Sequence, residues 1–378
     1  MTSATPLVTA ARARLRDIPA YRPGRSGAGP ASGKLSSNES PFGPAPAVRA
    51  ALAAAASTVG HYPDEYRARA VLAAQAGLPP SAILLTNGSD ELCYLLASVF
   101  LAPGRVAVLG DPPYQIDATA SLLAGATLSR VPLRDGAHDL DAMAAAARQA
   151  ALVWLPSPHN PTGTAVPASD LAAFLRQVPA DCLVVLDEAY RAFADPPGQP
   201  DIGALLAAHP NLVVQRTLSK DWALAGLRVG YALAAPELVE VLARARPPFS
   251  VNALALAAIE GSARAGAWQA MTVARVREQR SLLANELGRL GVEYYASQAN
   301  FITARLEAGL VGPPLAASGL VVRPGADLGL PGWVRISIGW APQMAALRAV
   351  LRELSRAGAL SHPAAPDRQP AAGEQARR

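Results

Sequence analysis

Seven short apolar segments, separated for the most part by helical patterns or loops, constrain the fold of this chain more than any other feature. Each is long enough for one strand and too short for a typical helix. Continuous apolar strands that alternate with helices are typical of a mostly parallel sheet covered on both faces. We therefore predict an α/β fold whose large domain holds a mostly parallel seven-stranded sheet, with strands at Ile83–Thr86, Val106–Leu109, Thr127–Val131, Ala151–Pro156, Cys182–Leu186, Leu212–Arg216 and Val229–Leu233.

The pattern changes after about Asn252, where a long helical pattern precedes shorter strand-like pieces. We predict a helix at Gly266–Gly288, a closing helix at Pro342–Arg356, and strand-like pieces at Glu293–Tyr295, Asn300–Arg305, Leu320–Arg323 and Trp333–Ile338. These elements indicate a smaller α+β domain. We expect an N-terminal arm and part of the small domain at 1–44, the large domain at 45–255, the small C-terminal domain at 256–360, and a disordered tail at 361–378.

Composition and charge favour a protein that acts on small molecules. No apolar run reaches the roughly 20 residues that a membrane span requires, and the N-terminus carries no secretion signal. The formal charge of +5 comes from dispersed arginines, which fits small anionic ligands better than nucleic acid. Cys93 and Cys182 lack the spacing of a disulfide framework, and no histidines stand at metal-ligand spacing. We expect a cytoplasmic protein with no metal and no membrane or nucleic-acid partner.

Lys220 is conspicuous because lysine is rare in this chain. Of the 34 Lys and Arg residues, only Lys34 and Lys220 are lysines. A guanidinium cannot lose its proton in a protein, whereas a partly buried lysine can do so and form a Schiff base. Lys220 is therefore a candidate for covalent chemistry. The alternative is an ordinary surface lysine.

Two polar motifs follow predicted strands, at the carboxyl ends where parallel sheets bind their ligands. Asn87–Glu91 opens a helix, so the backbone N–H groups of Ser89 and Asp90 would form a phosphate cradle, although a capped helix start needs the same residues. Asp187 ends the most apolar strand, where a carboxylate is costly to bury unless it meets a cation. It is suited to pair with a protonated heteroaromatic nitrogen, and a plain helix cap is the alternative.

Further candidates offer amide and guanidinium groups. A turn rich in Pro and Gly would aim the Asn160 amide at a ligand oxygen, although such a turn needs no ligand. Its neighbour His159 is more typical of a loop residue than of a catalytic base. Arg228 has the fork that suits a phosphate, and Arg323 and Arg335 lie in strand-like pieces of the small domain. Each of these arginines also fits an ordinary surface position.

Taken in order, these motifs resemble the fold type I pyridoxal-phosphate enzymes of the class I/II aminotransferase family. The order is Asn87-Gly88-Ser89-Asp90, Asn160-Pro161-Thr162-Gly163, Asp187-Glu188-Ala189-Tyr190, Ser219-Lys220 with Arg228, and then Arg335. The resemblance runs from about Ile18 to Leu354. Within the family the chain is most similar to the histidinol-phosphate aminotransferases, through Ile18–Tyr21, Lys34–Glu39, His61–Asp64 and Ala223–Arg228.

The resemblance implies a role for each candidate residue. Lys220 would hold pyridoxal 5′-phosphate as an internal aldimine and, once freed, move the proton between the substrate Cα and the cofactor. Catalytic roles would fall to Lys220, Asp187 and Tyr190. The cofactor would be bound by Ser89, Asp90, Tyr114, Asn160, Asp187, Tyr190, Ser219, Lys220 and Arg228, and by the neighbouring subunit's Tyr62 in a homodimer with shared active sites. The substrate would be bound by Tyr21, Asn38, Arg323 and Arg335.

The chain departs from the family pattern at Asp117, at Asp221-Trp222 and at Trp340. The family usually carries a second aromatic residue three positions after Tyr114, and this chain has Asp117 there. The resemblance gives Tyr114 as the candidate for stacking on the cofactor ring.

The resemblance predicts an aminotransferase that moves an amino group between L-histidinol phosphate and 2-oxoglutarate in histidine biosynthesis. A second hypothesis keeps the cofactor but changes the reaction or the substrate: a decarboxylase of an O-phospho amino acid, or an aminotransferase for an aromatic or secondary-metabolite amino acid. A third is a non-catalytic binding protein on the same fold. The intact Lys220, Asp187, Asn160 and Arg228 argue against this third hypothesis.

Overall fold

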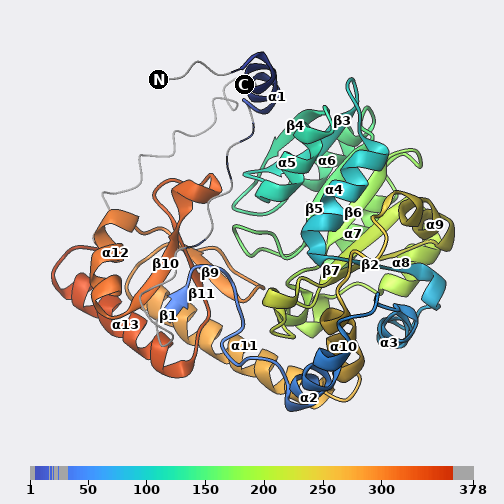
Figure 1. Cartoon of the computed structure of the whole chain (residues 1–378). Helices are drawn as coiled ribbons and strands as arrows, with labels where there is room; N and C mark the ends of the chain where they lie inside the picture. Colours follow the sequence, from blue (N-terminus) through green and yellow to red (C-terminus); the bar gives the residue numbers. More distant parts are fainter. Residues whose placement is uncertain (1–4, 17, 19, 21–23, 25–32, 361–378) are drawn as a thin grey trace, which may run out of the picture.

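The computed structural model of the chain describes residues 5–16, 18, 20, 24 and 33–360. Two sheets dominate this part of the chain, the larger on the right and the smaller on the left in Figure 1. The N-terminal helix α1 (Pro6–Leu15) lies apart from both sheets, with Leu7 and Leu15 exposed. The predicted substrate residue Tyr21, most of the predicted extended arm around it, and the predicted tail at 361–378 lie outside the described residues.

The large sheet has seven strands in the order β2-β8-β7-β6-β5-β3-β4. Neighbouring strands are parallel except where β8 pairs with β2 and β7. The predicted fold class is therefore confirmed, and all seven predicted strands are present. They are β2 (Ile83–Thr86), β3 (Val106–Asp111), β4 (Thr127–Pro132), β5 (Leu152–Pro156), β6 (Leu183–Asp187), β7 (Leu212–Thr217) and β8 (Gly230–Ala234).

Both faces of the large sheet are buried, which explains its continuous apolar strands. In β6, Val184 and Leu186 join the apolar cluster on one face, and Val185 joins the cluster on the other. Successive side chains of a strand point to opposite faces, so such a strand needs an apolar residue at each position. One face is covered by α2 (Pro46–Ala55), α3 (Tyr66–Ala76), α6 (Leu140–Ala147), α7 (Ala168–Leu175), α8 (Ile202–Ala208) and α10 (Ala253–Ser262), and the other by α4 (Gly88–Phe100), α5 (Gln115–Leu123) and α9 (Pro236–Ala245).

The small sheet joins the two ends of the described chain. Its strand order is β1-β10-β11-β9, so the N-terminal β1 pairs in parallel with β10 from the C-terminal part (Figure 1). The strands are β1 (Gly33–Leu35), β9 (Phe301–Ala304), β10 (Leu320–Pro324) and β11 (Val334–Ser337), and the helices that accompany them are α11 (Gly266–Arg289), α12 (Ala308–Ala317) and α13 (Ala341–Arg356).

The long helix α11 links the two sheets. Near its start, Trp268 packs on the apolar cluster of the large sheet, and further along Val276 and Leu283 lie in the cluster of the small sheet. The large-sheet cluster continues through α10 to Ala265. The domain boundaries given above stay predictions, since a helix shared by both clusters marks no sharp division between them.

Two local features of the small domain differ from expectation. The strand-like piece predicted at Glu293–Tyr295 is confirmed only in part, because it pairs with β9 through one antiparallel bridge, Tyr294 to Ala304, and backbone hydrogen bonds beside it without forming a strand. Helix α12 was not predicted from the sequence. It contains Pro313 and Pro314, which lack the N–H that an interior helical residue donates and which normally argue against a helix.

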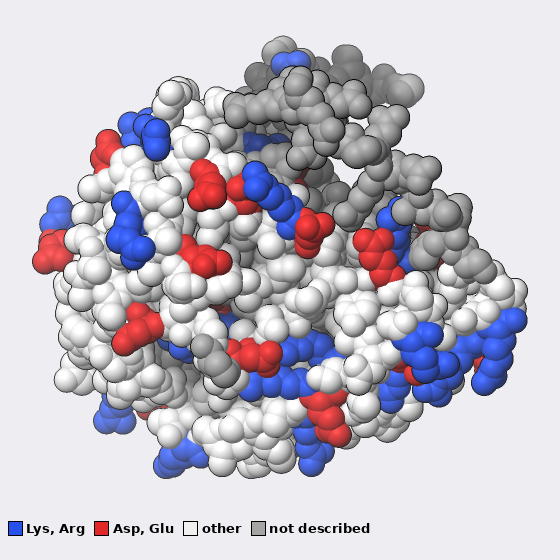
Figure 2. Space-filling view, turned by 180° about the vertical axis from the view of Figure 1, so that it is seen from behind, with Lys and Arg blue, Asp and Glu red and all other residues white. Residues whose placement is uncertain are grey.

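The surface carries both signs of charge. On the face in Figure 2, positive and negative side chains are scattered among uncharged ones. No helix in the described part of the chain is both long and apolar enough to cross a membrane.

Two histidines pack together, His159 in the loop that follows β5 and His138 just before α6. The rings of His138 and His159 meet edge to face, with centroids 4.7 Å apart. His138 Nε2 lies 3.0 Å from the Pro156 carbonyl oxygen, so this nitrogen carries the proton that is donated. Burial lowers the pKa of His138 to about 4 and the pKa of His159 well below its usual range. The folded protein therefore holds both rings neutral at pH 7.

The histidine pair predicts a loss of stability in mild acid. Between pH 6.5 and 4 these two histidines bind protons in the unfolded chain but remain neutral in the folded chain. The free energy of unfolding therefore falls as the pH falls. For His138 the linkage relation gives a loss of about 2 kcal/mol between pH 7 and pH 5. Urea unfolding at the two pH values measures it. His138→Gln keeps a donor for Pro156 and should reduce the loss by that amount; an unchanged loss would contradict the assignment.

Candidate active site

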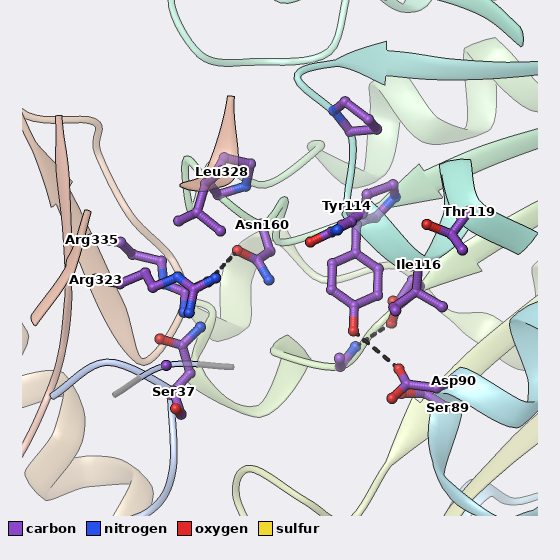
Figure 3. A pocket seen from close by; sticks show the side chains of 18 of the residues that line it. Ser37, Ser89, Asp90, Tyr114, Ile116, Thr119, Asn160, Arg323, Leu328 and Arg335 are labelled. Atoms are coloured by element: carbon purple, nitrogen blue, oxygen red, sulfur yellow. Dashed lines mark hydrogen bonds between the residues drawn. The ribbon is translucent and has the colours of Figure 1, made fainter. Parts of the chain in front are cut away.

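A cavity of about 1300 Å³ opens at the carboxyl ends of the large-sheet strands, and its far wall comes from the small sheet. Figure 3 shows Ser89, Asp90 and Tyr114 on one side of this cavity and Arg323 and Arg335 on the other. The structure brings together twelve of the predicted site residues as lining: Asn38, Ser89, Asp90, Tyr114, Asn160, Asp187, Tyr190, Ser219, Lys220, Arg228, Arg323 and Arg335.

One predicted site residue lies away from this cavity. Tyr62 is 81% exposed and stacks on the exposed ring of Phe249, with ring centroids 4.5 Å apart. It therefore takes no part in the cavity of its own chain. Tyr21, the other predicted residue missing from the lining, lies outside the described residues.

Asp187 is a buried group of the cavity that is held by two hydrogen bonds. It is only 7% exposed, because it ends β6, a strand buried on both faces. Its Oδ1 accepts from the Ala189 N–H at 2.8 Å, and its Oδ2 accepts from Gln215 Nε2 at 3.0 Å. Burial raises the pKa of Asp187 to about 6, and the charged side chains that act most on it, Asp90 and Glu188, are anionic as well. The carboxylate is thus well placed to pair with a cationic ligand atom.

Lys220 lies shortly after the end of β7, and its side chain lines the cavity. Its Nζ lies 5.7 Å from the centroid of the Tyr190 ring. The preceding Ser219 is held by Thr217, whose Oγ1 donates to Ser219 Oγ at 2.9 Å and accepts from the Ser219 N–H at 3.1 Å. These bonds fix the backbone just before the lysine, so its amine extends into the cavity from a rigid base.

The start of α4 forms an anion cradle. Ser89 and Asp90 stand in its first turn, where N–H groups lack helical acceptors and attract negative charge. Arg228 Nη2 lies 3.2 Å from Asp90 Oδ2, which places a guanidinium beside the cradle. The approach is close: a Cβ atom at Gly230 would lie 2.7 Å from backbone atoms of Gly88 and Ser89. Glycine is therefore required at 230 for the helix start to reach this position.

Tyr114 stands beside the cradle, just before α5. Its hydroxyl donates to Asp90 Oδ1 at 3.1 Å (Figure 3). Burial, together with the charge of Asp90, raises the pKa of Tyr114 well above its usual range, so the hydroxyl keeps its proton. The ring is thereby fixed at the edge of the cavity, across from Asn160 (Figure 3).

Asn160 connects the two sheets. Its Oδ1 accepts from Arg335 Nη1 at 2.7 Å, and its Nδ2 lies 3.5 Å from the Tyr190 hydroxyl. Arg335 and Arg323 are directly paired across β11 and β10, and both are almost completely buried. Two guanidinium groups on one wall give this end of the cavity a preference for anions. Arg323 also forms an ion pair with Asp327 at 3.5 Å.

Asn38 approaches the same hydroxyl from the N-terminal segment. Its Nδ2 donates to the Tyr190 hydroxyl at 3.0 Å, and its Oδ1 accepts from Ser337 Oγ at 2.8 Å. The residue has a φ of 54°, a conformation that Asn tolerates better than most residues do. The side chain is therefore held in one orientation by both partners.

Sequence reasoning missed two polar residues that support the site. Gln215 bonds Asp187 from the neighbouring strand, and Ser337 bonds Asn38 from β11. A signal for Gln215 was present: it interrupts the apolar segment Leu212–Arg216, and a fully buried polar residue needs a partner. The partner itself follows from register, which pairs Gln215 with Asp187.

The arrangement suits a planar ligand with a phosphate at one end and a protonated ring nitrogen at the other. The cradle at the start of α4 with Arg228 would take the phosphate, and the buried Asp187 would take the ring nitrogen. Lys220 provides a primary amine in the same cavity. Among the described residues, no cluster of His, Cys, Asp or Glu side chains is placed to hold a metal ion.

Comparison with known proteins agrees with this chemistry. The family model "Aminotransferase class I and II" matches residues 33–354. A histidinol-phosphate aminotransferase of Dechloromonas aromatica is 41% identical over 82% of this chain and 87% of its own, and one of Symbiobacterium thermophilum is 42% identical over 85% and 91%.

A solved structure has the same fold. The histidinol-phosphate aminotransferase of Sinorhizobium meliloti, determined in complex with pyridoxal-5′-phosphate, superposes with a TM-score of 0.81 at 28% identity, covering 94% of this chain and 98% of that one. The resemblance read from the motifs is confirmed. The chain belongs to the family of class I and II aminotransferases.

Proposed function

We propose that this protein is a pyridoxal-phosphate-dependent aminotransferase that moves an amino group between L-histidinol phosphate and 2-oxoglutarate. One observation carries the proposal: the buried Asp187, the amine of Lys220 and the anion cradle of α4 line one cavity. The curated relatives at 36% to 42% identity bear the name histidinol-phosphate aminotransferase, which supports the choice of substrate.

The residues of the cavity fit the cofactor. Ser89, Asp90, Ser219 and Arg228 would hold its phosphate, Asp187 its ring nitrogen, Asn160 and Tyr190 its phenolic oxygen, and Tyr114 would stack on its ring. When bound, pyridoxal phosphate withdraws electrons from the substrate Cα once its ring nitrogen is protonated. Asp187 would keep that proton in place. The charged groups that act most on its carboxylate are anionic, so the ionised carboxylate would stabilise the charged ring nitrogen.

Lys220 has two duties in this proposal. Its amine holds the cofactor between turnovers, and the freed amine then carries a proton to and from the substrate Cα. The centroid of the Tyr190 ring lies 5.7 Å from Lys220 Nζ, and Asn38 donates to the Tyr190 hydroxyl. The ring therefore bounds the space in which the amine moves. A neutral amine is required for proton transfer, and Lys can supply it where Arg cannot.

The two buried arginines would read the anionic end of each substrate. Arg323 and Arg335 face the cavity from adjacent positions of β10 and β11, and Asn38 and Tyr21 would add hydrogen bonds. A guanidinium fork donates hydrogen bonds to a phosphate or a carboxylate with similar geometry. One pair of arginines thus serves histidinol phosphate in one half-reaction and glutamate or 2-oxoglutarate in the other.

A homodimer with shared active sites belongs to the proposal. Tyr62 and Phe249 form an exposed aromatic pair that does not line the active-site cavity of their own chain, and monomeric proteins rarely expose large apolar groups together. We propose that Tyr62 reaches the cofactor phosphate of the neighbouring subunit. A cytoplasmic location is also proposed, since the free thiols Cys93 and Cys182 suit a reducing compartment.

Replacement of Lys220 tests the covalent role. In Lys220→Arg the charge remains but the nucleophilic amine is lost, so we expect no absorbance band of a protein aldimine and activity reduced about a thousandfold or more. Lys34→Arg is the matched control and should retain both, because Lys34 forms a surface ion pair with Glu39. Retention of the absorbance in Lys220→Arg would contradict the proposal.

A donor panel tests the substrate. Histidinol phosphate, histidine, phenylalanine and phosphothreonine are supplied with 2-oxoglutarate, and glutamate and CO2 are measured. We expect glutamate from histidinol phosphate with a kcat/KM at least about tenfold above histidine and phenylalanine, because these two lack the phosphate that would form charge-assisted hydrogen bonds to the buried arginines. Release of CO2 without glutamate would favour the decarboxylase hypothesis instead.

Mixed dimers test the shared site. In Tyr62→Phe we expect the cofactor dissociation constant to rise roughly tenfold to a hundredfold, the effect of removing a hydrogen bond to a charged group. A heterodimer of Tyr62→Phe with Lys220→Ala contains one site with both residues. At limiting cofactor it should show about half of wild-type activity, since one of two sites is complete. An inactive heterodimer would place Tyr62 in the site of its own chain.

A further inference from the structure

A chain of four buried polar side chains runs from Asp117 on α5 to Asp187. Cys93 Sγ lies 3.4 Å from Asp117 Oδ1 and 3.5 Å from Gln215 Oε1, and Gln215 Nε2 donates to Asp187 Oδ2 at 3.0 Å. Asp117, Cys93 and Gln215 are each no more than 1% exposed. None of the three belongs to the cavity lining, so they act on Asp187 from behind.

The number of protons available along this chain limits which group can donate in each contact. The amide of Gln215 is oriented by Asp187, since only its NH2 group can donate to a carboxylate, and its Oε1 therefore faces Cys93 as an acceptor. A thiol has one proton. If that proton goes to Gln215, the contact between Cys93 and Asp117 is a hydrogen bond only when Asp117 supplies the proton.

The surroundings of Asp117 favour the protonated form. Asp187 of β6 and Asp90 of α4, both anionic, raise the pKa of Asp117, whereas a hydrogen bond donated by the Cys93 thiol would lower it. Burial, together with Asp187, raises the pKa of Asp117 well above its usual range. Two neighbouring buried carboxyl groups each disfavour ionisation of the other, and Asp187 is the one that the cofactor's protonated ring nitrogen would meet.

We propose that Asp117 is a positioning residue that stays a neutral carboxylic acid and heads a chain of donors, Asp117 to Cys93 to Gln215 to Asp187. Each member donates toward Asp187, so the chain strengthens the last hydrogen bond and stabilises the ionised carboxylate that holds the cofactor's ring nitrogen. This inference rests on the proposed function, because the ring nitrogen is that of pyridoxal phosphate.

The pH dependence of cofactor binding tests the proposal. Protein freed of cofactor is titrated with pyridoxal phosphate between pH 5 and 8, and the dissociation constant is read from visible absorbance. Wild-type protein should show an inflection near pH 6, where Asp187 ionises. In Asp117→Leu the donor is lost, and we expect the inflection to move upward with binding about threefold to tenfold weaker at pH 6. Asp117→Asn keeps a neutral donor and should behave as wild type.

The outcomes distinguish a neutral Asp117 that donates, an ionised Asp117, and an Asp117 that has no effect on Asp187. An ionised Asp117 repels the charge of Asp187, so both substitutions would then move the inflection downward and overturn the proposal. No shift in Asp117→Leu would overturn it as well. Thermal unfolding of the cofactor-free variants checks that each is folded.

Cys93 gives a second test that does not alter Asp117. Cys93→Ala breaks the chain in its middle and should shift the inflection upward as Asp117→Leu does, whereas Cys93→Ser retains a donor and should not. An unshifted Cys93→Ala would overturn the proposal even if Asp117→Leu fails to fold. Wild-type protein that bound no pyridoxal phosphate would contradict the proposed function itself, and this inference with it.

Discussion

The buried carboxylate of Asp187 is the group on which the rest of the site depends. The apolar β6 carries it to the carboxyl edge of the sheet, where burial raises its pKa to about 6 and its charged neighbours are anionic. Such a group either takes up a proton or meets a cation. The hydrogen bonds from Ala189 and Gln215 favour the ionised form and leave the carboxylate facing the cavity. The parallel sheet thus supplies both the position and the low polarity that would make the proposed ion pair with a ring nitrogen strong.

Hydrogen bonds between the two sheets join the proposed cofactor residues to the proposed substrate residues. Asn160 from the large domain accepts from Arg335, and Tyr190 accepts from Asn38, which is in turn held by Ser337 of β11. A movement of the small sheet would therefore disturb these hydrogen bonds at the proposed cofactor site as well as the buried arginines. In the proposed function the anionic end of a substrate would be held on the same wall that orients Asn160, which would place recognition and chemistry within one hydrogen-bonded network.

The sequence predicts much of this architecture for identifiable physical reasons. Continuous apolar segments follow from burial on both faces, so the strands of the large sheet could be located without knowing their order. Polar residues directly after strands marked Asn160 and Asp187, because parallel strands bring their carboxyl ends to one edge. Other features depend on contacts distant in sequence. The bond from Gln215 to Asp187 follows from strand register, and α12 forms despite two prolines, which local propensity alone would not predict.

The most direct measurement of the central claim is the site of covalent attachment. The chain contains only two lysines, so reduction of the cofactor-loaded protein with borohydride, followed by proteolysis and mass spectrometry, has few possible results. The account predicts a phosphopyridoxyl group on Lys220 and an unmodified Lys34. Modification of Lys34 alone, or of neither lysine, would contradict it.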